Sequence, residues 1–127
     1  MLDRRFLALP AAALLAGAVA VAGATGATTR RTRLHVSADA SGQLRFTKKR
    51  LVARHPGRVT VVMANPSGSG LPHGIAIAGH GVHRTGRVVG PGGRSHVTAR
   101  LRPGRYRFHC PVPGHRAAGM RGTLVVR

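Results

Sequence analysis

Acidic residues are almost absent from this sequence. Its 127 residues include 21 lysines and arginines, but Asp3 and Asp39 are the only acidic side chains and glutamate does not occur. The formal net charge is +19 at pH 7. A field of this sign repels other copies of the chain and attracts polyanions, with a strong dependence on salt. Acidic proteins, anionic lipid headgroups, wall polymers and nucleic acids are all compatible with the charge alone.

Aromatic residues are scarce as well. Tryptophan is absent, and the aromatic residues are Phe6, Phe46, Tyr106 and Phe108. A hydrophobic core must therefore consist mainly of Val, Leu, Ile and Ala. The 18 glycines and 8 prolines favour many turns between short strands over long helices.

Short stretches with alternating or β-branched residues recur along the chain, and neither an amphipathic helix nor an internal repeat is present. The expected strands cover residues 34–37, 44–46, 51–53, 59–64, 74–78, 95–101, 105–110 and 122–127. The glycine-rich stretch 79–94 is expected to be irregular. This pattern predicts an all-β domain, a Greek-key antiparallel β-sandwich.

Residues 1–24 have the pattern of a signal peptide, with an N-terminal signal helix. Arg4 and Arg5 precede an uncharged run over residues 6–22, and Ala22-Gly23-Ala24 is a suitable cleavage site. The run is about 17 residues long, the short limit for a membrane-spanning helix, so a retained membrane anchor is the alternative. We expect a flexible lead-in at 25–33, a single domain at 34–127, and export to the periplasm, cell surface or medium.

The single cysteine excludes an intramolecular disulfide and directs attention to its neighbours. Cys110 lies in the stretch HCPVPGHRAAGM, residues 109–120. The alternation over 105–110 turns Cys110 inward at the end of a strand and His109 outward. Prolines stiffen the turn that follows and a glycine lets it curl, so His115 and Met120 are expected to return to the cysteine.

A fourth ligand must come from elsewhere in the chain, and His73 is the best candidate. It follows Pro72 at the start of an expected strand, and loops at one end of a sandwich lie close together. Two imidazoles, a thiolate and a weak axial thioether form the ligand set of a blue-copper centre. A structural zinc site more often uses several cysteines without methionine. We therefore expect one type 1 copper ion.

The motif Cys-x4-His-x4-Met at Cys110, His115 and Met120, with His73 upstream, resembles that of the cupredoxins. These are the type 1 blue-copper proteins of the plastocyanin and azurin family, and the loop spacing is similar to that of rusticyanin and sulfocyanin. The resemblance extends over residues 33–127. It implies the β-sandwich fold, export from the cytoplasm and one-electron transfer through Cu(II)/Cu(I) between redox partners.

The residue after the first histidine departs from the pattern of this family. Many relatives carry Asn or Ser there, whose side chain helps to tie two ligand loops together, whereas this chain has Gly74. The N–H groups of Gly74 and Val112 are expected to donate hydrogen bonds to the Cys110 sulfur, which favours Cu(I).

Few charges are expected around His115, and electrons would leave through an apolar patch there. The members of this electron-exit patch are Leu71, Pro72, Pro111, Pro113, Ala117 and Ala118. Redox proteins that dock here are expected to be acidic, because the domain is strongly basic.

Three other functions compete with a single-electron carrier. A multicopper oxidase needs several His-x-His pairs and a binuclear copper site needs two cysteines, so we expect no enzyme. A periplasmic or cell-surface protein that stores or delivers copper would use the same ligands and is the main alternative. A nucleic-acid-binding module lacks its usual exposed aromatics and recognition helix here. Association with anionic membrane or wall polymers is an expected secondary role of a monomeric protein.

Overall fold

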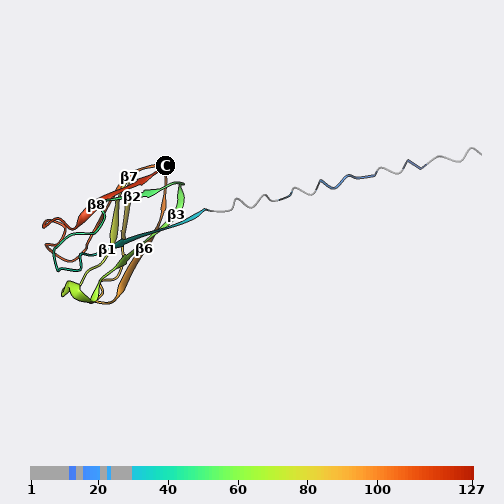
Figure 1. Ribbon diagram of the computed structural model, residues 1–127. Helices are drawn as coiled ribbons and strands as arrows, with labels where there is room; N and C mark the ends of the chain where they lie inside the picture. The colour runs from blue at the N-terminus through green and yellow to red at the C-terminus, as the bar shows by residue number, and fades with distance from the viewer. Residues whose placement is uncertain (1–11, 14–15, 21–22, 24–29) are drawn as a thin grey trace, which may run out of the picture.

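The computed structural model describes residues 12–13, 16–20, 23 and 30–127. The domain consists of strands and one short 3-10 helix, η1 (Figure 1). The elements are β1 (Arg31–Ser37), β2 (Arg50–Ala53), β3 (Gly57–Ala64), η1 (Ser67–Ser69), β4 (Ala76–Gly79), β5 (Val82–Thr85), β6 (Arg94–Leu101), β7 (Gly104–His109) and β8 (Arg121–Val126).

Two sheets form the sandwich, which confirms the predicted fold class. One sheet has the strand order β1-β3-β6 and the other has the order β2-β8-β7-β4-β5. Two neighbouring pairs, β1 with β3 and β2 with β8, are parallel, and the remaining pairs are antiparallel. The parallel pairs arise because the chain crosses to the other sheet between their members, as parallel strands require.

The core fills the space between the sheets with small aliphatic side chains, as the composition predicts. Strand β6 shows the period-two pattern of a half-buried strand, with Val97, Ala99 and Leu101 buried and the residues between them exposed. The rings of Phe46 and Phe108 pack with centroids 5.4 Å apart. Burial of this apolar surface is the main force that holds the two sheets together.

Two local expectations were wrong. Residues 44–46 form no strand, and Phe46 makes a single β-bridge with Ala38. Hydrogen bonds from Ser41 and Arg45 to the Asp39 carboxylate shape this segment as a turn, which competes with strand pairing.

The second difference lies in the glycine-rich stretch that was expected to be irregular. There β5 pairs with β4 as a hairpin. The two turn residues, His80 and Gly81, have φ angles of 49° and 76°, the left-handed conformation that suits a tight hairpin.

Most strand boundaries also differ from the expected ones by one to three residues. β1 begins at Arg31 rather than at residue 34, and β4 begins at Ala76 rather than at residue 74. The predicted signal helix falls largely on residues outside those described and stays a prediction. In the described part of the chain, no helix has the length and apolar character needed to span a membrane.

Candidate metal centre

The hairpin between β7 and β8 brings Cys110 and Met120 together at its root. The N–H of Cys110 donates to the carbonyl of Met120 at 3.1 Å, and the N–H of Met120 donates to the carbonyl of His115 at 3.0 Å. Gly114 and Gly119 adopt φ angles of 82° and 119°, which let the loop reverse its direction. The backbone thus returns both His115 and Met120 towards the cysteine, as the sequence predicts.

His73 reaches the same place from the neighbouring strand. It forms an isolated β-bridge with Val89, through hydrogen bonds of 3.0 and 2.8 Å in the two directions. The chain then enters β4, whose Ala76 is the partner of His109 on β7. Because β4 and β7 are adjacent, the segment that leads into β4, with His73 three residues before the strand, lies beside Cys110 at the end of β7.

Three potential ligand atoms converge at this point. Sγ of Cys110 lies 3.9 Å from Nδ1 of His73 and 3.6 Å from Nδ1 of His115. The ligand atoms of these three residues all lie within 4.8 Å of one another. His73, Cys110 and Met120 are buried, whereas His115 is only partly buried. The site therefore communicates with the surface through the imidazole of His115.

The surroundings of His73 favour its neutral form. Burial lowers the pKa of this imidazole, and the neighbouring His115 lowers the pKa further. A neutral imidazole keeps the lone pair that a metal ion requires. Its Nδ1 atom faces the Cys110 sulfur, and its Nε2 atom is buried without a hydrogen-bond partner. Nitrogen and sulfur donors in this arrangement, with a buried thioether beside them, fit copper.

The sequence of residues 33–127 matches the model of a family described as copper binding proteins, plastocyanin/azurin family. This chain belongs to that family. It is a cupredoxin, with copper as its cofactor, and its general function is copper-based electron transfer.

Solved structures of other proteins share the fold of this cupredoxin. Auracyanin B is 23% identical with a TM-score of 0.65, over 79% of this chain and 91% of its own. Dithionite-reduced auracyanin of Roseiflexus castenholzii is 24% identical with a TM-score of 0.63, over 76% and 97%. Auracyanin A of Chloroflexus aurantiacus, a "blue" copper protein, is 16% identical with a TM-score of 0.61, over 77% and 100%. A comparison with curated proteins finds no match to this chain.

The predicted electron-exit patch occupies the surface at the same end of the cupredoxin. Leu71 is 37% exposed, Pro72, Pro113, Ala117 and Ala118 are exposed, and Pro111 is half-buried. His109 was expected to face the solvent, but it is half-buried, and burial is the main cause that lowers its pKa. The hydrogen bonds from the N–H groups of Gly74 and Val112 to the sulfur stay predictions.

Sequence reasoning missed Asn65, which organises the loop before His73. Its side-chain amide donates to the carbonyls of Leu71 at 2.9 Å and Val89 at 3.0 Å, and its Oδ1 accepts from the hydroxyl of Ser69 at 2.5 Å. Asn65 is 1% exposed. Asn65 therefore connects the two segments that position His73. One is the loop before His73, which contains Leu71, and the other contains Val89, the β-bridge partner of His73. An Asn-Pro step directly after a buried strand was the available signal.

Proposed function

We propose that this cupredoxin is an exported carrier of single electrons whose copper is held by His73, Cys110, His115 and Met120. The convergence of two imidazole Nδ1 atoms on one buried thiol supports the proposal most directly. Copper bound there would supply the Cu(II)/Cu(I) couple. Thiolate and thioether favour the reduced ion and imidazole suits both states. Ligands fixed by backbone hydrogen bonds need little rearrangement when the charge changes.

The protein directs electrons through His115 in this proposal. This imidazole belongs to the ligand cluster and is also partly exposed among the residues of the electron-exit patch. A patch of Pro, Ala and Leu side chains loses little hydration when a partner docks, which brings the two redox centres close. The basic surface around the domain selects acidic redox proteins and accelerates their approach.

The location and the absence of substrate chemistry form part of the same proposal. Residues 1–24 would direct the chain out of the cytoplasm, to the periplasm, the cell surface or the medium, either by cleavage or as a retained anchor. The exported domain carries electrons and acts on no substrate of its own. Electrostatic association with anionic membrane or wall polymers accompanies this role.

Burial of the ligands favours a carrier over a protein that stores or delivers copper. His73 and Met120 are 0% exposed, and Cys110 is 1% exposed. A copper ion behind these side chains exchanges slowly, because an accepting ligand reaches it only where His115 is exposed. Delivery would require the loop 111–119 to open.

Addition of Cu(II) to the purified protein tests the proposal. We expect an intense blue colour that disappears on reduction and returns on oxidation over many cycles. Cys110→Ser and His73→Ala should abolish the colour, whereas His83→Ala, on the exposed β5 hairpin, should retain it. A colourless wild-type protein would contradict the carrier. Rapid loss of copper to a chelator during redox cycling would favour delivery instead.

A further inference from the structure

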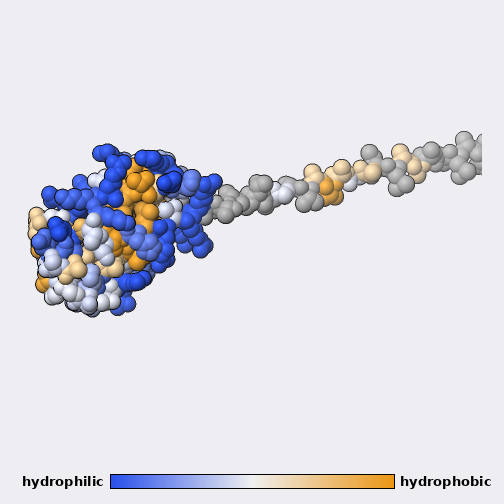
Figure 2. Space-filling view, in the orientation of Figure 1, coloured by the Kyte–Doolittle hydropathy of each residue, from blue (hydrophilic) through white to orange (hydrophobic). Residues whose placement is uncertain are grey.

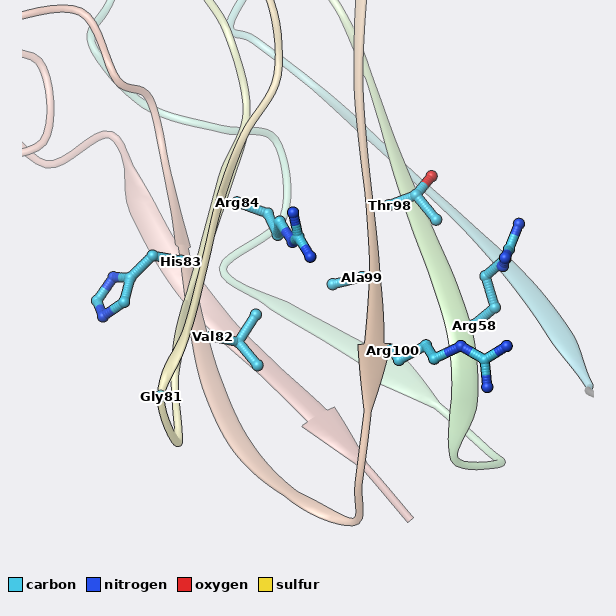
Figure 3. Close-up of a pocket in the computed structure, with 8 residues that line it drawn as sticks. All are labelled: Arg58, Gly81, Val82, His83, Arg84, Thr98, Ala99 and Arg100. Atoms are coloured by element: carbon cyan, nitrogen blue, oxygen red, sulfur yellow. The ribbon is translucent and has the colours of Figure 1, made fainter.

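A row of three arginines crosses the outer face of the sheet formed by β1, β3 and β6. Arg31 on β1 is the direct partner of Arg58 on β3, and Arg58 is the direct partner of Arg100 on β6. All three residues are exposed. Figure 3 shows Arg58 and Arg100 extending to the same side of the sheet as Thr98, while Ala99 points the other way. The alternation of the strands thus directs the whole row to the outside.

This arginine row is unfavourable in the isolated protein. Side chains directly opposite one another in a sheet lie close together, and like charges in such positions destabilise the pairing. No carboxylate compensates them, since Asp39, the one acidic side chain in the described part of the chain, pairs with Arg45 at 2.7 Å. An anionic partner that contacts the row would relieve this repulsion.

Further basic groups widen the row into a surface. The outer face of this sheet, here called the arginine face, presents the side chains of Arg31, Arg33, Arg58, Arg94, Arg100, His35 and His96. A groove of about 660 Å³ beside it adds Arg84 from β5, whose side chain extends towards this sheet, whereas His83 points the other way (Figure 3). Thr60 and Thr98 share a hydrogen bond of 2.8 Å in the next row, which confirms that these strands present one common face. The positive charges therefore extend both across the strands and along them.

The arginine row lies at the end of the domain opposite the metal centre. Strand β3 runs from Arg58 in the row to Ala64, and the loop that leads to His73 follows. Six residues of extended strand separate these points by roughly 20 Å. In Figure 1, the chain enters β1 at one end of the sandwich, whereas η1 and the loop between β7 and β8 lie at the other end.

The N-terminal sequence joins the domain at the same end as the row. Arg31 is the first residue of β1, and residues 23–30 connect it to the uncharged run at 6–22. Eight residues span at most about 28 Å. Figure 2 shows a strongly hydrophilic surface near this junction and a paler surface at the end with the metal-site loops.

We propose that the arginine face binds the surface of an anionic phospholipid bilayer. A sheet face with charges spread in two directions matches a plane of phosphates better than a linear polyanion, which would follow a single groove. Basic residues near an anionic bilayer are attracted within about one Debye length. In this orientation the apolar run reaches the bilayer, and the loops around His115, at the other end of the domain, stay outside the contact and open to a redox partner. The surface operates independently of the copper chemistry proposed above.

Vesicle binding by the copper-loaded full-length chain tests this surface. The measurement compares vesicles of phosphatidylcholine alone with vesicles that also contain phosphatidylglycerol, at low ionic strength. The apolar run contributes equally to binding of both kinds of vesicle, so its contribution cancels in the ratio of the two partition coefficients. The row variant carries Arg31→Gln, Arg58→Gln and Arg100→Gln.

The control variant also removes three positive charges, but from positions outside the arginine face. Arg105, Arg107 and Arg127 are exposed on and beside the five-stranded sheet, and each is replaced by Gln. We expect the row variant to lose on the order of 100-fold of the preference for anionic vesicles. The control variant should lose at least tenfold less, since its arginines do not face the bilayer in the proposed orientation.

Three outcomes would overturn the proposal. Equal losses in the two variants would mean that net charge alone attracts the protein. An absence of preference for anionic vesicles in the wild type would exclude lipid as the partner. Binding to soluble polyphosphate is measured in parallel. If the row variant loses polyphosphate binding but keeps vesicle binding, the arginine face binds a polymer instead of a bilayer. If the row variant does not fold, the single variant Arg58→Gln replaces it. This variant should lower the ratio of the two partition coefficients about fivefold, and an unchanged ratio would contradict the proposal.

Discussion

Gly74 lies against Pro111, so the residue after His73 touches the residue after Cys110. A β-carbon at Gly74 would lie 3.1 Å from Cγ of Pro111, 3.2 Å from its Cδ and 3.1 Å from the backbone oxygen of Arg87. The two ligand loops of this cupredoxin are therefore joined by direct packing. A larger residue at this position, such as the Asn or Ser of many relatives, would not fit this arrangement unchanged.

Substitution of Gly74 by alanine should disturb the metal centre. The added methyl group is confined between the Pro111 ring and the Arg87 backbone, so the loops that carry His73 and Cys110 must separate by a few tenths of an ångström. Overpacking of this kind costs about 1–3 kcal/mol. We expect a lower unfolding free energy of the apoprotein and a shifted visible spectrum of the copper form. Gly90→Ala is the matched control, because nothing lies within 4 Å of its β-carbon; equal effects of both variants would disprove the packing argument.

Asn65 is expected to control the position of His73 without touching the metal. Asn65→Ala removes the amide donors to the carbonyls of Leu71 and Val89 and the acceptor of the Ser69 hydroxyl. Loss of each hydrogen bond costs about 0.5–1.5 kcal/mol. The copper signal in electron paramagnetic resonance should broaden, because the His73 loop then samples several positions. Ser67→Ala, at an exposed position of η1, should change neither quantity. A destabilised variant with an unchanged copper signal would restrict Asn65 to a purely structural role.

The sequence was most informative where the chemistry is local. Cys110, His115 and Met120 belong to a single loop, and the prolines and glycines around them encode the turn that brings them together. His73 was found because its residue type completes a known ligand set, and the adjacency of β4 and β7 explains why it reaches the site. The β-sandwich was predicted from the alternation of apolar and polar residues and from the many glycines and prolines.

Features that depend on tertiary contacts were missed. The segment 44–46 alternates like a strand, but hydrogen bonds to Asp39 shape it as a turn. Strand β5 has little apolar character, with three of its four residues exposed, and it forms because β4 offers an edge with which it can pair. The Asn-Pro step marks Asn65 as a turn residue but does not identify its partners, because Leu71 and Val89 reach it only where two loops meet.

A charge placed in the electron-exit patch should slow electron transfer and leave the copper site intact. Ala117 is exposed in the loop that contains His115, so Ala117→Glu introduces a negative charge where an acidic partner would dock. We expect the second-order rate with an acidic redox protein to fall about tenfold, with an unchanged visible spectrum. His55→Glu changes the charge equally in the turn before β3, at the far end of the domain. If both variants slow the reaction equally, the patch is not the exit.

The stability of the apoprotein should depend on Asp39 in a defined range of pH. Hydrogen bonds from Ser41 and the neighbouring Arg45 lower the pKa of this carboxyl group from 3.8 to about 2. The folded state therefore prefers the ionised form, and the resulting stabilisation is fully present above pH 3.8 and is lost as the pH falls through about 2. Asp39→Asn should be less stable than the wild type at neutral pH, and the difference should shrink across this acid range.

Denaturant titrations at a series of pH values measure this difference in the free energy of unfolding. Arg45→Gln keeps the Ser41 hydrogen bonds, so it should remove only part of the pH dependence, because the side chain of Ser41 is the larger cause of the shift. Ser41→Ala should remove more of it. A difference between Asp39→Asn and the wild type that stays constant from neutral pH to pH 2 would show that the ionised carboxylate contributes nothing, and that only the shape of the turn at residues 39–45 matters.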